Sequence, residues 1–248
     1  MSTLVAAAQN THSKTWLRNK YRVFALLAAA ASVWCAVSAF AGRTFHAGDL
    51  TLSLTGSPFT MLELLNVLWV PLLSFMMASD FFASELSGHA IKFEVLRPIG
   101  RSGLYLSKMA GMLLYCAELY AGSLLIHAVL AILFRGAYVL PFLLAGSLMS
   151  LLVALTFVSV SCFVANLLGH ASLAMFVLIL VYAVMSFVGS AFPQFGVFFF
   201  TSYLNWYKMF AGSHIPWSGI LSSVAMLLST IGMTTALGQW LFDRKDLD

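Results

Sequence analysis

The chain has 248 residues, of which 61% are hydrophobic and only 9% are Asp, Glu, Lys or Arg. A mean hydropathy of +0.92 and recurrent apolar runs of about twenty residues exclude an ordinary soluble protein and predict an all-α membrane protein. The formal net charge of +4 does not indicate nucleic-acid binding, because the bases cluster beside the apolar runs, where they determine membrane topology.

Residues 1–22 combine basic side chains with large apolar ones. Lys14, Arg18 and Lys20 lie close in sequence to Trp16 and Tyr21. This pattern is typical of an interfacial helix, with its rings at headgroup level and its bases in water. A solvated basic tail is the alternative. The first membrane span is predicted at residues 23–41, and the glycines and proline of residues 42–58 predict a loop beyond it.

The second span is predicted at residues 61–78, and Glu63 lies near its start. Thr60 and Glu63 have the spacing of a capping box, in which both side chains accept hydrogen bonds from free backbone N–H groups at a helix start. We therefore interpret Glu63 as a cap. A functional acid inside the membrane is the alternative.

A polar stretch separates the second and third spans. It contains Asp80, Glu85, Lys92, Glu94, Arg97, Arg101 and Lys108. So many charges in a chain with few of them predict a segment that lies in water or against another protein. We expect it to contact a partner.

The third span is predicted at residues 109–134 and contains Glu118 and His127. Ionisable groups inside a membrane are costly and indicate function. Nine residues at about 100° each place these two side chains on opposite faces of a helix, which argues against a proton relay between them. We expect Glu118 to face a neighbouring helix or a transport cavity. The fourth and fifth spans are predicted at residues 140–166 and 171–191.

Residues 192–217 hold ten aromatic side chains in 26 positions, interrupted by prolines, glycines, Lys208 and His214. This segment is too broken for a spanning helix and too apolar for a free loop. It predicts short re-entrant helices that dip into the outer leaflet, acting either as a gate or as an aromatic anchor. The sixth span is predicted at residues 218–242, so residues 1–248 form one six-span domain.

The bases predict the orientation of the chain. With both termini in the cytoplasm, ten Lys and Arg residues lie inside, and only Arg43, Arg135 and Lys208 lie outside. This bias favours an inner-membrane protein with six spans and cytoplasmic N- and C-termini.

Motifs for nucleotide, serine or metal chemistry are absent from the sequence. It has no Gly-Lys dipeptide and hence no phosphate-binding loop, and it has no G-x-S-x-G, H-E-x-x-H or paired cysteines with metal spacing. We therefore expect no catalytic residue, no metal and no cofactor bound by this chain.

The polar stretch also resembles the first cytoplasmic loop of permease subunits of ABC-2-type ABC transporters, especially the short bacitracin- and lantibiotic-resistance type. The resemblance rests on Glu85, Gly88, Ile91, Lys92, Pro98, Arg101 and Lys108, with His89 and Ala90 where that family has Gly-Thr. The C-terminal ending from Phe242 to Leu247 and the number of spans extend it over the whole chain.

The resemblance implies a coupling helix at about residues 80–97 that docks on a separate ABC ATPase subunit, which would bind ATP and Mg. The residues implied in coupling are Asp80, Phe81, Phe82, Glu85, Leu86, Gly88, Ile91, Lys92, Phe93, Pro98 and Arg101. It also implies a dimer with a second copy or a related permease.

Few polar groups line the predicted spans, whereas the outer segment is strongly aromatic. This balance favours export of a hydrophobic peptide or lipid-like compound from the bilayer, through a path lined or gated by Glu118, Phe198, Phe199, Tyr203, Trp206 and Tyr207.

Two other classes of function are alternatives. An ion-coupled secondary transporter would use Glu63 or Glu118, and a non-transporting scaffold would use neither. Secondary transporters often contain helices broken by Gly or Pro near the midplane. We expect none of the six spans to be broken in this way, and this expectation favours the exporter.

Overall fold

A computed structural model describes residues 3–41, 59–88, 100–133, 140–210 and 216–245. These residues form helices and no strand. Six helical stretches are long and apolar enough to cross a membrane, which confirms the prediction of a multi-pass membrane protein. They are Asn19–Ser38, Thr60–Ser87, Arg101–Leu133, Leu140–Leu168, Ala171–Ala191 and Trp217–Arg244.

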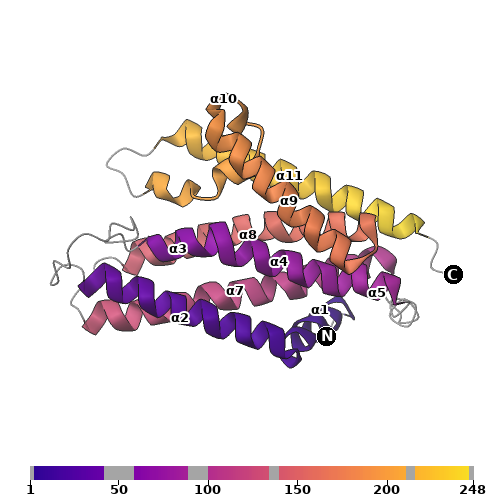
Figure 1. The fold of residues 1–248 in the computed structure, drawn as a ribbon, viewed down its shortest axis with the longest axis horizontal. Helices are drawn as coiled ribbons and strands as arrows, with labels where there is room; N and C mark the ends of the chain where they lie inside the picture. Colours follow the sequence, from indigo (N-terminus) through magenta and orange to yellow (C-terminus); the bar gives the residue numbers. More distant parts are fainter. Residues whose placement is uncertain (1–2, 42–58, 89–99, 134–139, 211–215, 246–248) are drawn as a thin grey trace.

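The long helices of the bundle lie side by side (Figure 1). They are α2 (Asn19–Ala41), α7 (Arg101–Leu133), α8 (Leu140–Leu168), α9 (Ala171–Ala191) and α11 (Trp217–Arg244), together with the composite helix from α3 to α5. Helix α7 packs against α2 and α8, and α8 packs against α4 and α11. Helix α5 and the end of α11 lie toward the same end of the bundle (Figure 1).

The sequence places four of the six spans within a few residues of the observed helices and misjudges two ends. Helix α9 has the predicted bounds. The second span was predicted to end at residue 78, but its helix continues to Ser87, and the third was predicted to begin at residue 109, but α7 begins at Arg101. At both places charged residues that indicate water in the sequence are held inside the protein.

The composite helix is built from α3 (Thr60–Leu64), the π-helical segment η1 (Leu65–Trp69), α4 (Val70–Ala78), the π-helical segment η2 (Ser79–Ala83) and α5 (Ser84–Ser87). Pro71 follows η1 and explains it, because a proline ring clashes with the carbonyl four residues earlier, here that of Val67. That carbonyl accepts a hydrogen bond of 2.6 Å from the Tyr182 hydroxyl instead. The π-helical turn is a bulge and not a break, because the helix continues without interruption from Thr60 to Ser87.

Shorter helices precede and interrupt the spans. Helix α1 (Thr3–Leu17) packs against α7, and α10 (Pro193–Gly196), η4 (Phe200–Tyr203) and η5 (Trp206–Phe210) connect α9 with α11. Helices therefore form where the sequence predicted them, at the N-terminus and in the aromatic segment. Their placement at a membrane surface or within a leaflet stays a prediction.

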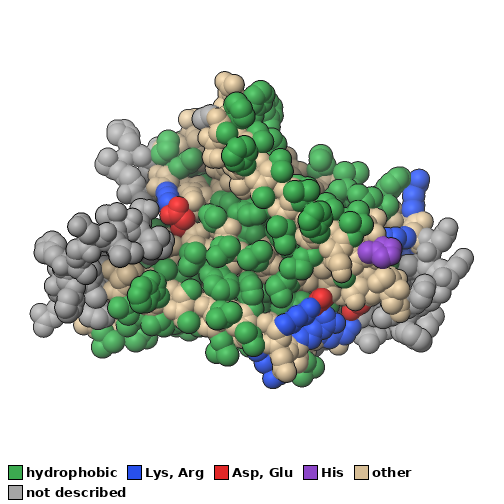
Figure 2. Space-filling view, viewed as in Figure 1, with side chains coloured by type: hydrophobic (Ala, Val, Ile, Leu, Met, Phe, Trp, Pro, Cys, Tyr) green, Lys and Arg blue, Asp and Glu red, His purple; other side chains and the backbone are tan. Residues whose placement is uncertain are grey.

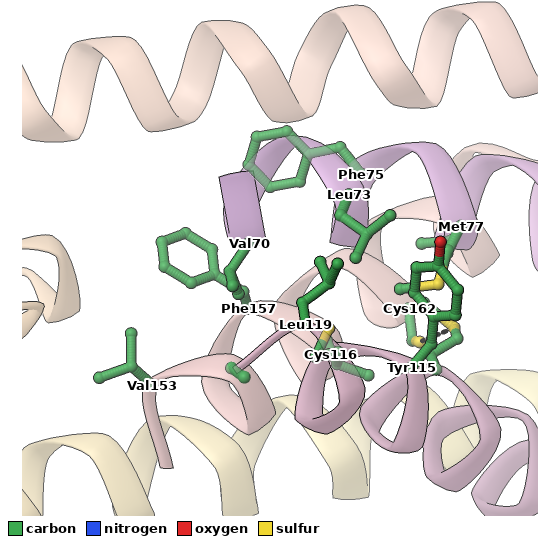
Figure 3. Packing of buried hydrophobic residues seen from close by; sticks show 14 of the residues in the cluster. Val70, Leu73, Phe75, Met77, Tyr115, Cys116, Leu119, Val153, Phe157 and Cys162 are labelled. Carbon is green, nitrogen blue, oxygen red and sulfur yellow. Dashed lines mark hydrogen bonds between the residues drawn. The ribbon is translucent and has the colours of Figure 1, made fainter. Parts of the chain in front are cut away.

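The core lies where the composite helix meets α7 and α8. Leu73 and Phe75 of α4, Cys116 and Leu119 of α7, and Phe157 of α8 gather there (Figure 3). On the face shown in Figure 2, hydrophobic side chains cover the middle of the molecule, while charged side chains lie at its left, at its lower edge and at its right. An apolar surface over the middle of a helical bundle is compatible with the hydrocarbon of a bilayer.

Candidate functional site

The α1–α2 turn is bonded to the composite helix through Asp80. This carboxylate accepts hydrogen bonds of 2.6 Å from Arg18 Nη1 and from the Tyr21 hydroxyl. Lys20 also forms an ion pair with it. The first two helices of the chain are thus fixed to the end of the second span by three side chains.

A second ion pair, between Glu85 and Lys108, joins α5 to α7. The Lys108 side chain is only 2% exposed, and its ammonium also donates a hydrogen bond of 2.9 Å to the Phe81 carbonyl in η2. Lys14 of α1 lies 3.7 Å from Glu85. Charges buried in this way are stable only when paired, so removing Lys108 leaves Glu85 with only the more distant Lys14 as a counter-charge. We call Arg18, Lys20, Asp80, Glu85 and Lys108 the charged junction.

Phe81 and Phe82, which the resemblance implies in coupling, are not available to a partner protein. Their side chains are 1% and 0% exposed. Phe81 stacks on Tyr21, and the Phe82 ring lies 5.1 Å from Tyr105 and 6.3 Å from Phe242, measured between ring centroids. The two rings pack inside this chain because η2 and α5 continue the span rather than form a separate helix.

The other residues predicted to take part in coupling lie in different places. Leu86 is half-buried and Gly88 is exposed at the end of α5. Arg101 Nη1 donates hydrogen bonds of 3.0 and 3.1 Å to the carbonyls of Asp243 and Lys245 and so fixes the end of α11. Ile91, Lys92, Phe93 and Pro98 lie outside the described residues.

Glu118 faces α1 and a cavity. Its carboxylate accepts a hydrogen bond of 2.7 Å from Trp16 Nε1 and lies 2.8 Å from His12 Nε2. It also lines a largely apolar cavity of about 170 Å³ between α2 and α7. His127 does not join it, because its Nδ1 lies 3.1 Å from the Ser123 carbonyl one turn away on the same helix. The sequence offered no signal that His12 and Trp16 would be the partners of Glu118.

Glu63 is not a helix cap. Phe59 occupies the N-cap position and makes no side-chain capping bond. The Glu63 carboxylate instead accepts a bond of 2.7 Å from Lys208 Nζ and a longer one of 3.4 Å from Asn205 Nδ2. The capping-box interpretation was wrong because the partner lies 145 residues away in the sequence.

The predicted aromatic gate is largely part of the core. Trp206 and Tyr207 are 7% and 2% exposed. Burial and the nearby Glu63 carboxylate raise the pKa of Tyr207, so its hydroxyl keeps its proton and donates a bond of 3.4 Å to the Phe59 carbonyl. Tyr203 and Phe199 are half-buried, whereas Phe198 is 72% exposed. Of the five rings, Phe198 is the one most open to a substrate or to lipid.

A buried polar network connects the composite helix with three other parts of the chain. Asn66, in η1, donates hydrogen bonds of 3.0 Å to Ser150 Oγ and to the Leu204 carbonyl. Its Oδ1 accepts a bond of 2.5 Å from the Tyr120 hydroxyl. We did not single out Asn66 from the sequence, although an amide in the middle of an apolar run is a signal of such a network.

Comparison with known proteins leaves the family open. No family model matches the chain, and no curated protein matches it. Among the residues that the structure describes, no group of three or more His, Cys, Asp or Glu side chains could hold a metal ion. The functional argument therefore depends on the residues themselves.

Proposed function

We propose that this chain is the permease subunit of an ATP-driven exporter of the ABC-2 type, with a separate ABC ATPase subunit as its partner. It would lie in the inner membrane with both termini in the cytoplasm and move a hydrophobic or amphipathic substrate outward. No phosphate-binding loop occurs in the sequence, so the ATP and Mg would be bound by the partner.

The observation that carries the proposal is the charged junction. A force applied to residues 89–99, which follow the composite helix, would act on a helix end bonded to α1 and α2 through Asp80 and to α7 through Glu85. Because these bonds are short and partly buried, the helices would move together rather than slide past one another. A transport subunit requires such a connection so that movement of the ATPase is transmitted to its helices.

The surface proposed to meet the ATPase is smaller than the resemblance implied. We omit Phe81 and Phe82, whose rings are buried within this chain. Leu86, Gly88 and the stretch from Ile91 to Pro98 remain, beside Arg101 at the start of α7. We also assign Glu85 a structural part, because its carboxylate is bonded within the charged junction.

An amphipathic substrate is supported by the surfaces beside the bundle. The cavity lined by Glu118 has mostly apolar walls and a carboxylate that is 44% exposed. Between α10 and η4, the Phe198 ring is open. A molecule with an apolar body and a polar group would find matching surfaces at these two places.

A dimer is supported by the sparse packing of two spans. Only 11% of the apolar window of Ala171–Ala191 and 22% of that of Trp217–Arg244 is buried within one chain. A second copy, or a related permease, would complete a twelve-span domain and give each of two ATPases a surface to engage. Crosslinking in native membranes that yields one permease with one ATPase would contradict this arrangement.

Purification from the native membrane tests the exporter proposal most directly. We expect a P-loop ATPase to copurify and its hydrolysis to respond to amphipathic peptides or lipids in nanodiscs. Arg101→Ala is expected to retain ATP hydrolysis and lose transport, while Arg244→Ala, at an exposed position of the same end of α11, serves as the control. Absence of any ATPase, together with an intact permease, would overturn the proposal.

The secondary-transporter alternative has less support. Glu63 is paired with Lys208, and Glu118 contacts both His12 and Trp16. The helix that contains Pro71 is continuous from Thr60 to Ser87, whereas secondary transporters often contain helices broken near the midplane. Transport driven by an ion gradient in liposomes containing only this chain would favour it.

A further inference from the structure

The cavity beside Glu118 is lined largely by small or apolar residues of α2 and α7. Its lining includes Ala25, Ala28 and Ala29 of α2 and Gly122 of α7. Its volume, about 170 Å³, is below the range of about 300–1,000 Å³ that is typical of sites for whole drug-sized molecules. The cavity therefore suits one end of a longer ligand.

The carboxylate in this cavity is balanced differently from the other paired carboxylates. Asp80, Glu85 and Glu63 each form an ion pair with Lys or Arg side chains. Among the described residues, the ion pair of Glu118 is with His12 instead. Histidine is ordinarily neutral at pH 8. At that pH the cavity keeps a negative charge that no described Lys or Arg pairs with.

The Glu118 carboxylate is also open to a ligand, because its side chain is 44% exposed. Trp16 Nε1 donates one hydrogen bond of 2.7 Å to Oε2. His12 Nε2 lies 2.8 Å from Oε1 but makes no hydrogen bond with any described residue. A carboxylate can accept about four hydrogen bonds. The contacts within the chain therefore leave acceptor positions for a further group.

Trp16 gives a second reason to expect an organic cation. Its side chain is 40% exposed, lines the same cavity and is held beside Glu118 by the hydrogen bond from Nε1. Organic ammonium groups are attracted to the face of an indole ring. An anion would be repelled by the carboxylate, and a wholly apolar group would take water from it without supplying a counter-charge.

An exposed apolar face continues from the cavity along α7. Glu118, Gly122, Leu125 and Val129 follow one another at i, i+4, i+7 and i+11, which is the spacing of one helix face. The side chains of Leu125 and Val129 are both more than half exposed. At 1.5 Å per residue, this face extends about 17 Å from the carboxylate. It offers an alkyl chain an apolar surface next to the charged cavity.

We propose that Glu118 binds the ammonium group of an amphipathic organic cation, whose alkyl chain lies along Leu125 and Val129. Such a ligand is a cationic member of the amphipathic class proposed above, so its role as a substrate rests on the proposed function. Its binding does not, because the residues of this chain alone form the site.

Equilibrium binding to the purified chain in dodecyl maltoside micelles at pH 8 tests the site. The probes are dodecyltrimethylammonium and dodecanol, which share an alkyl chain and differ in charge, and empty micelles give the partition of each. After that correction we expect about tenfold stronger retention of the cation, as for an ammonium group beside a carboxylate and an indole. Equal retention of the two probes would overturn the proposal.

Two variants locate the site. Glu118→Gln removes the charge and keeps the shape of the side chain. Gly122→Phe fills the cavity from an exposed position at which a Cβ meets nothing within 4 Å, so it remains informative if the first variant loosens α1. Both should abolish the preference for the cation, and a preference that survives both would contradict the assignment.

Each variant has a matched control. Glu63→Gln removes a carboxylate of similar exposure, 46% against 44% for Glu118, that is already paired with Lys208. Gly232→Phe changes an exposed glycine of α11 at which a Cβ also meets nothing within 4 Å. Both controls should keep the preference. Its loss in the controls as well would show that the cation does not bind at Glu118.

Competitors distinguish an amphipathic cation from a free cation and from a lipid headgroup. Tetramethylammonium has the charge without the chain, and dioleoyl phosphatidylcholine has the ammonium group beside a phosphate that Glu118 would repel. We expect neither to displace dodecyltrimethylammonium at equal concentration. Displacement by the first would mean that the alkyl chain contributes nothing, and displacement by the second that the site takes a lipid headgroup. Either result would overturn the proposal.

Failure of this site and failure of the exporter proposal give different results. If an ATPase copurifies but the chain shows no preference for the cation, the binding site alone is wrong. If the preference is found and no ATPase copurifies, the exporter proposal is wrong and the binding site stands.

Discussion

The ammonium group of Lys108 and the carboxylate of Glu85 form an ion pair inside the protein, between two helices that are each long enough to cross a membrane. Lys108 is two turns into α7, and Glu85 lies close to the end of the composite helix. The pair fixes how the second and third spans approach each other.

Separate removal of the two charges should be far more damaging than removal of both. Lys108→Met is expected to lower the free energy of unfolding by about 3–5 kcal/mol, because Glu85 would remain buried with too little compensation. In the double variant Glu85→Leu/Lys108→Met most of that loss should be recovered. Thermal unfolding of the two single variants and the double variant gives the coupling energy between the residues. Additive effects of the two single changes would show that the residues are not coupled.

Gly111 of α7 should be essential for docking of α1. A Cβ at this position would lie 2.7 Å from Thr11 Cβ and 2.8 Å from the Ala8 carbonyl oxygen, so Gly111→Val has to displace α1. We expect hydrogen exchange in Thr3–Leu17 to accelerate by at least about tenfold, as for an element that opens locally. Gly122→Val on the same helix is the control, since a Cβ there meets nothing within 4 Å. Equal protection of α1 in both variants would refute the contact.

The loss of the whole Asn66 amide should lower the stability more than the loss of any one of its hydrogen bonds. Asn66→Leu leaves the Tyr120 hydroxyl and the Leu204 carbonyl without this partner, at about 1–3 kcal/mol for each buried group. Ser150→Ala removes only one acceptor and should cost about 1 kcal/mol. Thermal unfolding of both variants gives the comparison. Similar losses would mean that the network does not act through Asn66.

Arg101 should control the end of α11. Arg101→Ala removes hydrogen bonds to the carbonyls of Asp243 and Lys245, each contributing about 0.5–1.5 kcal/mol. We expect faster hydrogen exchange at the last turn of α11 and little change elsewhere. Arg244→Ala, which removes a guanidinium stacked 4.4 Å from the centre of the Trp240 ring, should leave that exchange unchanged.

The spans could be predicted from the sequence because about twenty consecutive apolar residues have few alternatives to a membrane helix. The two misjudged ends share one cause. Lys108 and Asp80 indicate water when considered alone, yet each is held by partners from other helices. Hydropathy assigns a value to each residue separately and so does not include the partners that lie beside Lys108 and Asp80 in the structure.

The site residues were harder to predict for the same reason. The local spacing of Thr60 and Glu63 indicated a cap, but Lys208 forms the ion pair with Glu63. The aromatic composition of residues 192–217 indicated an exposed gate, but composition does not tell which rings turn inward, as Trp206 and Tyr207 do. The first error comes from a contact between residues more than a hundred positions apart in the sequence. The second arises because composition does not show which side of a segment is buried.

The contacts of α1 also limit when this helix can dock on the rest of the protein. Arg18 of the α1–α2 turn bonds Asp80, and His12 Nε2 lies 2.8 Å from the carboxylate of Glu118, which follows His12 by 106 residues. At a synthesis rate of about 5–20 residues per second, α1 waits roughly 5–20 s before Glu118 is made. Ala7, Ala8, Thr11 and Thr15 of α1 are buried in the finished structure, where α1 packs against α7, and during that interval they have no third span to cover them. Helix α1 thus reaches its place only after the third span has been made.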